Sequence, residues 1–172
     1  MKILVYGFGP YQIFKENITS KIVKKLKPKY KIYKKIFLVK FDRAQFIREI
    51  KKIQPDLIIG LGQSGGPNSR RKKITIERKA LNLRPSGKRL SKIEESKPEK
   101  VLVNLRIKTN KYSRISYNAG TYVCNFSMWV NATYAKSNGI KYAFIHIPYN
   151  FNLGRAVRFV EGKINLAVNA QK

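Results

Sequence analysis

The hydrophobic positions of the chain fall into short apolar runs, separated by longer stretches in which apolar and polar residues mix. The runs are rich in β-branched and aromatic residues, which favour buried strands. The run at 75–83 is the least regular of them. Together they predict strands over 3–6, 32–41, 57–61, 75–83 and 142–147.

Between these runs, apolar residues recur at the spacing of one helix face. Asp42 has the side chain of an N-cap residue and directly precedes such a stretch. Asn138-Gly139 is a helix-stop signal at the end of another such stretch. The polar segment 84–100 interrupts the pattern and predicts a mobile excursion. The predicted helices cover 18–26, 43–53, 121–136 and 156–170.

Strands that alternate with helices indicate an α/β sandwich with a largely parallel, twisted sheet. The 172 residues, 43% of them hydrophobic, are enough for one domain with a sizeable core, so we expect a single domain over 1–172. Sites in such sheets form beyond the carboxyl ends of strands. Three segments lie at the carboxyl ends of predicted strands: GFGP, GLGQSGG and IHIPYN.

The charge of the chain is extreme, with 37 Lys and Arg against 9 Asp and Glu and a net charge of +28. Such a field attracts polyanions and acidic partners, although a compositional drift toward lysine is the simpler alternative. We see no RNA-recognition motif, so we expect at most weak, salt-sensitive nucleic-acid binding. A single cysteine, no apolar run of membrane length and no signal-peptide pattern predict a cytoplasmic protein without a membrane partner.

The glycine-rich stretch Gly60 to Gly65 fits two motifs. As G-x-G-x-x-G it suggests a dinucleotide site, and as G-x-S-x-G it suggests Ser64 as a nucleophile, with Glu77 and His146 following in the order of an α/β-hydrolase triad. Both motifs need a helix immediately afterwards, whereas the chain continues PNSRRKK. A serine hydrolase using Ser64 therefore stays an alternative, and a turn or ligand-approaching loop is the simpler interpretation.

Cys124 is the only cysteine of the chain, and a lone cysteine is most often a small buried apolar residue. A helix that begins near Thr121 would place it in the first turn, where unpaired N–H groups stabilise a thiolate and an oxyanion. His146, the only histidine, ends an apolar strand, and Glu77 lies in a β-prone stretch. A base needs a third group to orient it, so these three residues form a candidate cysteine triad.

Five stretches of the chain resemble the pyroglutamyl peptidases, a family of cysteine peptidases, in order and approximate spacing: GFGPYQIFKEN, GLGQSGG, ITIERKALN, SYNAGTYVCN and FIHIPYN. The resemblance implies a three-layer α/β/α sandwich, with Cys124 as nucleophile, His146 as base and Glu77 as its orienting partner. It further implies removal of an N-terminal pyroglutamyl group from peptides through a thioester acyl-enzyme, no cofactor and no metal, and a homo-oligomer, often a tetramer.

By the same resemblance, the pyroglutamyl ring lies between aromatic side chains at Phe8, Tyr11 and Tyr122, with Gln63 near the substrate. A flat, uncharged lactam suits an aromatic slot with a few backbone hydrogen bonds. The thiolate attacks the exocyclic carbonyl, His146 protonates the leaving amine, and water then releases the acyl group.

The chain departs from the family pattern at several positions. Gly9 replaces an acidic residue, Gln12-Ile13 replaces Gly-Gly, and Ile18 replaces a proline after Asn17. LRPSGKRLSK replaces an acidic stretch that carries an oxyanion-assisting arginine, and Arg84 is the candidate for that role. A non-catalytic, basic binding protein on the same fold is therefore the second hypothesis.

Overall fold

The computed structural model describes residues 1–11, 14–66 and 68–170. Gln12, Ile13 and Pro67 lie outside the described residues, so the Gln12-Ile13 substitution and the helix-breaking position of Pro67 are not addressed by the structure.

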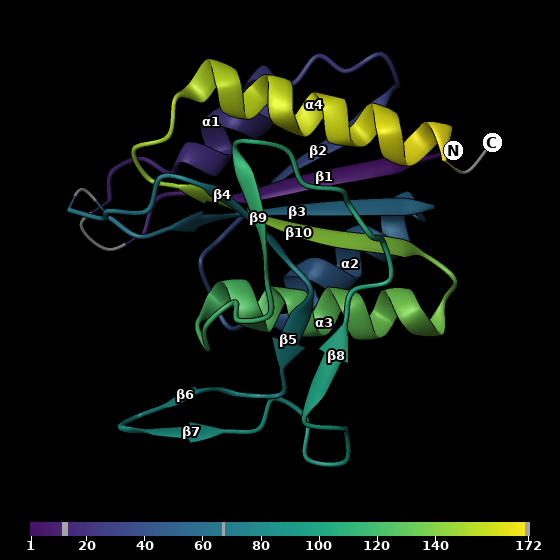
Figure 1. Ribbon diagram of the computed structural model, residues 1–172. Helices are drawn as coiled ribbons and strands as arrows, with labels where there is room; N and C mark the ends of the chain where they lie inside the picture. The colour runs from purple at the N-terminus through teal and green to yellow at the C-terminus, as the bar shows by residue number, and fades with distance from the viewer. Residues whose placement is uncertain (12–13, 67, 171–172) are drawn as a thin grey trace.

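A six-stranded sheet forms the centre of the molecule, in the order β2-β1-β3-β10-β4-β9 (Figure 1). All neighbouring pairs run parallel except β10 and β4, which are antiparallel. The sheet is therefore largely parallel, as predicted. Its strands are β1 (Ile3–Phe8), β2 (Ile32–Phe37), β3 (Leu57–Ser64), β4 (Ile74–Glu77), β9 (Ser113–Ser116) and β10 (Lys141–Pro148).

Helices cover both faces of this sheet. α1 (Ile18–Lys25) and α4 (Leu153–Asn169) lie on one face, and α2 (Arg43–Ile53) and α3 (Val123–Ser137) lie on the other (Figure 1). Side chains cap three of the helices at their N-termini: Asn17, Asp42 and Asn152 each accept a hydrogen bond from a first-turn N–H. The predicted three-layer α/β/α sandwich is confirmed.

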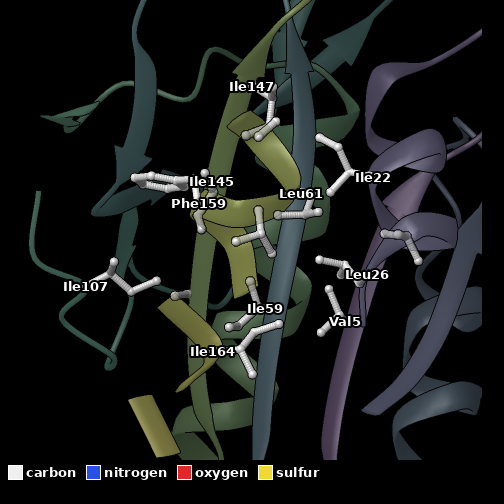
Figure 2. Close-up of a cluster of buried hydrophobic side chains, with 14 of the residues drawn as sticks. Val5, Ile22, Leu26, Ile59, Leu61, Ile107, Ile145, Ile147, Phe159 and Ile164 are labelled. Atoms are coloured by element: carbon white, nitrogen blue, oxygen red, sulfur yellow. The ribbon is translucent and has the colours of Figure 1, made fainter. Parts of the chain in front are cut away.

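Alternation along the central strands divides the core into two layers. Ile59 and Leu61 of β3 pack with Ile145 of β10 against α1 and α4 (Figure 2), whereas Ile58 and Phe144 pack against α2 and α3. A strand that is covered on both faces must be apolar at every position. This requirement explains why these strands appear in the sequence as continuous hydrophobic runs.

The run predicted as one strand over 75–83 is two strands in different sheets. β4 ends at Glu77, and β5 (Lys79–Leu81) leaves the main sheet to pair with β8 (Lys100–Leu102). Between them, the Arg78 guanidinium donates to the carbonyls of Leu105 and Ile107 at 3.3 and 2.6 Å. The side chain thus holds the chain where it changes direction.

The segment predicted as a mobile excursion contains a hairpin, β6 (Arg84–Ser86) with β7 (Arg89–Ser91), beneath α3 (Figure 1). The buried Asn82 side chain accepts from the Ile93 and Glu94 amides, both at 2.9 Å. Glu94 Oε1 in turn accepts from Trp129 Nε1 at 2.9 Å and from Arg43 Nη1 at 2.7 Å. These polar contacts tie the segment to α2 and α3.

Candidate active site

Cys124 is the second residue of α3, so its thiol lies in the first helical turn, as predicted. Tyr122 is the N-cap residue, but its side chain makes no capping hydrogen bond, and the first turn contains no acidic residue. The N–H groups of this turn are therefore not occupied by a cap side chain. A helix start of this kind can stabilise negative charge on sulfur or oxygen.

His146 and Glu77 come from the one antiparallel pair of the sheet. In the register, His146 of β10 lies opposite Thr75, and Glu77 of β4 lies opposite Phe144. The two side chains are diagonal neighbours on the face that α3 covers. His146 Nδ1 and Glu77 Oε1 are 2.8 Å apart, and the residues are only 6% and 2% exposed. The carboxylate therefore fixes the imidazole, as the sequence predicts for an orienting partner.

Gly62 lets Cys124 approach His146. It lies opposite His146 in the β3–β10 register. A Cβ atom at Gly62 would lie 2.7 Å from His146 Cδ2 and 2.8 Å from Cys124 Sγ, closer than real Cβ contacts allow. The missing side chain thus leaves the space in which the thiol and the imidazole meet.

The pKa of His146 reflects all of these neighbours. Burial alone lowers the pKa, but the charge and hydrogen bond of Cys124, together with Glu77, raise it to about 9. The imidazole therefore stays protonated at neutral pH when Cys124 is a thiolate. An imidazolium beside a thiolate gives a nucleophile and a proton donor at the same place.

A titration of His146 tests this coupling directly, because the chain has no other histidine. We expect its ring resonances to titrate near pH 9 in NMR spectra. Cys124→Ala should move the midpoint to lower pH, since it removes the sulfur charge that favours the imidazolium. Ser64→Ala is the control and should leave the midpoint in place. If the His146 titration of the Cys124→Ala variant has the same midpoint as that of the wild type, the thiol and the imidazole are not coupled.

A cavity of about 180 Å³ opens beside Cys124. The structure brings all four predicted substrate-binding residues to its wall: Phe8, Tyr11, Gln63 and Tyr122. The Tyr11 and Tyr122 hydroxyls hydrogen-bond to each other, and their ring centroids are 5.4 Å apart. Burial and this hydrogen bond raise the pKa of Tyr122 to about 12, so the phenol stays neutral.

Five wall residues were missing from the predicted site: Phe14, Asn17, Val39, Gly65 and Val123. Phe14 and Val39 add apolar surface to the cavity, and nothing in their sequence context marks them as site residues. Phe14 follows the predicted Tyr11 in the same loop, and Val39 lies two residues after the end of β2, at the sheet edge where sites are expected. The sequence predicted a strand through residue 41, so it placed Val39 inside a strand and not at its end.

The glycine-rich motifs around Ser64 do not form the structures that they require. β3 continues through Ser64, and within the described residues no helix begins between Ser64 and β4. The Ser64 hydroxyl is buried and has no hydrogen-bond partner among the described residues, so it makes no hydrogen bond to the His146 ring. The geometry therefore provides neither a nucleophile elbow nor a helix start for a dinucleotide.

Arg84 begins β6, next to the start of α3. The Asn125 side chain donates to the carbonyls of Leu81 and Leu83, both at 2.9 Å, and accepts from the Leu81 amide at 2.8 Å. These bonds attach the chain leading into Arg84 to the residue after Cys124. Arg84 Nε is buried and has no hydrogen-bond partner among the described residues.

Within residues 1–11, 14–66 and 68–170, no three His, Cys, Asp or Glu side chains gather as metal ligands would. The helices of the described chain are all too short or too polar to cross a bilayer.

A thiol, an imidazole and a carboxylate in series, at the edge of an α/β/α sheet, have the geometry of a cysteine hydrolase. A family model described as "Pyroglutamyl peptidase" matches residues 1–115 and 98–153. The chain belongs to this family.

Relatives with assigned names are consistent with this membership. A pyrrolidone-carboxylate peptidase of Lysinibacillus sphaericus is 37% identical, with 88% of this chain and 83% of the relative covered. Pyrrolidone-carboxylate peptidase 2 of Caldanaerobacter subterraneus subsp. tengcongensis is 31% identical, with 100% and 98% covered.

Solved structures share the fold at lower identity. Pyrrolidone carboxyl peptidase from Thermococcus litoralis superposes with a TM-score of 0.82 at 23% identity, over 98% of this chain and 93% of the other. Pyroglutamyl peptidase I from Bacillus amyloliquefaciens gives 0.83 at 24% identity, over 97% of each chain.

Proposed function

We propose that this protein is a cysteine peptidase that removes an N-terminal pyroglutamyl group from peptides. The observation that carries the proposal is the position of Cys124, which lies at the wall of the aromatic cavity and hydrogen-bonds to a histidine held by Glu77. Pyroglutamate has no free amine, so a carboxylate that recognises amines would be of no use here. The described residues of the cavity wall next to Cys124 include no Lys, Arg, Asp or Glu, as a neutral lactam requires.

In the proposed reaction, the Cys124 thiolate attacks the carbonyl that joins pyroglutamate to the next residue. A carbon–sulfur bond forms, and the carbonyl oxygen becomes an oxyanion beside the first-turn N–H groups of α3. Arg84 is the proposed additional support for this oxyanion. His146 then gives its proton to the leaving amine as the carbon–nitrogen bond breaks. Water attacks the resulting thioester, returns a proton to His146 and releases pyroglutamate.

A pyroglutamyl-aminomethylcoumarin assay tests the proposal, with alanyl-aminomethylcoumarin as the matched substrate that carries a free amine. We expect turnover of the first and little of the second, because an ammonium group would have to enter an uncharged aromatic cavity. Pyroglutamyl substrate that binds without turnover would favour the second hypothesis, a binding protein on an enzyme fold.

The proposal also covers the domain organisation, cellular location, cofactor requirement and oligomeric state of the protein. We infer that residues 1–172 act as one domain, that the protein works in the cytoplasm without a cofactor, and that it forms a homo-oligomer. The resemblance to the family suggests a tetramer, which sedimentation equilibrium would distinguish from a monomer.

The positive charge next to the site leads to a prediction about salt. Residues 70–73, RRKK, are all exposed and directly precede β4, which carries Glu77. We expect faster turnover of peptides with acidic residues after the pyroglutamate at low salt. Nucleic acid should bind weakly, without base preference and less as salt rises.

Replacing all four residues of 70–73 by serine should reduce both effects without changing turnover of an uncharged substrate. Equal turnover of acidic and basic peptides at low salt would contradict the steering effect. Tight, sequence-selective nucleic-acid binding at high salt would contradict the electrostatic explanation.

A further inference from the structure

A second cavity, of about 230 Å³, lies on the opposite side of the sheet from Cys124. It is formed between the C-terminal half of α4 and residues 105–108. These residues belong to the segment that connects β8 to β9 (Figure 1). Its apolar wall consists of Leu105, Ile107, Leu166, Ala167 and Ala170. No residue lines both this cavity and the one beside Cys124.

Lys163 also lines this cavity, and its surroundings are unusual for a lysine. The residue is only 8% exposed, and its Nζ lies 5.0 Å from the ring centroid of Phe159, one helical turn earlier. It makes no hydrogen bond or ion pair with any other described residue. Burial lowers the pKa of Lys163 accordingly. A cation–aromatic contact offsets only part of the cost of enclosing a lysine side chain that has no counter-ion among the described residues.

The neighbouring charges add to this imbalance. Arg106 and Lys108, both exposed, also line the cavity, and none of the described residues that line it carries a carboxylate. Glu161 is the acidic residue nearest to Lys163 in sequence, but its Oε1 accepts from the Lys27 amide at 2.5 Å, beyond α1. The cavity therefore combines one lysine whose side chain is largely buried, two exposed cations and an apolar wall.

We propose that this cavity binds a small organic anion in which a carboxylate is joined to an apolar group. The carboxylate would pair through a charge-assisted hydrogen bond with Lys163, which has no counter-ion among the described residues. The apolar group would cover Leu105, Ile107 and Leu166, the last of which is 60% exposed. Two sources share this chemistry, namely a fatty acid and the C-terminal end of a peptide with an apolar last residue.

Calorimetric titration of the full chain tests the proposal with octanoate and with N-acetyl-leucine as probes. Octanol, which lacks the charge, and acetate, which lacks the apolar part, are the matched control ligands. We expect octanoate or N-acetyl-leucine to bind at least tenfold more tightly than either control, and the tighter of the two identifies the source. Equal binding of acetate would overturn the proposal, because it would indicate only general attraction to a positive surface.

Substitutions test whether octanoate binds in this cavity. Lys163→Met keeps a chain of similar length without the charge, and we expect it to weaken octanoate binding about tenfold or more. Lys163→Arg should retain much of the affinity, and Lys136→Met, at an exposed position of α3, should retain all of it. Leu166→Ser alters an exposed position and provides a second test if Lys163→Met does not fold. Octanoate affinity that is unchanged in both Lys163→Met and Leu166→Ser would overturn the assignment.

The result does not depend on the proposed peptidase activity, since the binding assay requires no turnover. Octanoate at saturation should leave the hydrolysis of a pyroglutamyl substrate unchanged, because the two cavities share no residue. Self-association that abolishes octanoate binding as protein concentration rises would overturn the proposal, by showing that a second copy covers this face.

Discussion

A Cys124→Ala variant should release no coumarin from a pyroglutamyl substrate above background, whereas Ser64→Ala should keep most of the wild-type rate. Loss of a covalent nucleophile costs ~10³-fold or more in kcat. Cys124 is partly buried at the cavity wall and hydrogen-bonded to His146, so alanine removes the attacking atom with little change in packing. Ser64 has no such contact.

Covalent labelling provides an independent measurement for the same comparison. Iodoacetamide should modify Cys124 and stop turnover, and bound substrate should slow the modification. A fluorophosphonate should leave the enzyme active. If the fluorophosphonate labels Ser64 and blocks turnover while iodoacetamide has no effect, the cysteine mechanism is wrong.

Glu77→Gln should lower kcat by about 10²- to 10⁴-fold while the protein stays folded. Glutamine has nearly the same shape, so the buried position between β10 and β9 remains filled. It lacks the negative charge that helps to keep His146 protonated, and its amide does not fix the ring as a carboxylate does. The measurement is kcat together with a thermal unfolding curve for each variant.

Glu94→Gln is the matched control for this substitution. Glu94 also accepts hydrogen bonds through a partly buried carboxylate, but its partners are Trp129 and Arg43. We expect this variant to lose some stability and to keep its kcat. A folded Glu77→Gln variant with an unchanged rate would mean that Glu77 serves only as a strand residue.

The sequence predicted the elements that have strong local signals. The helix over 43–53 was predicted with its observed bounds, because Asp42 caps it and its apolar residues share one face. β1, β3 and β10 were found because strands covered on both faces are apolar throughout, although each extends a few residues further than predicted. The predicted strand over 32–41 ends at Phe37.

The elements that were missed depend on tertiary contacts. β9 is only four residues long and carries an exposed arginine, so its sequence has no strand pattern, and pairing with β4 defines it. The change of sheet after Glu77 depends on the Arg78 contacts with a distant segment. The hairpin over 84–91 projects away from the sheet, so its residues are polar. This polarity led to the prediction of a mobile excursion in place of two strands.

The candidate site was more predictable than these elements. Cys124 and His146 are the only residues of their types, Glu77 is one of only nine acidic residues, and the element ends that carry them meet at one edge of the sheet. The antiparallel direction of β4 was not predictable, yet it is what brings Glu77 alongside His146. Phe14 and Val39 were missed because an apolar wall residue has the same sequence signature as a core residue.

The indole of Trp129 packs in the core and also provides a fluorescence signal. It is the single tryptophan of the chain, it is 1% exposed, and its N–H donates to Glu94 in the segment between β7 and β8. Release of that segment from α3 would remove the acceptor and admit water to the ring. The fluorescence spectrum of Trp129 therefore reports, without a label, whether the segment between β7 and β8 is attached to α3. This signal can be followed during turnover.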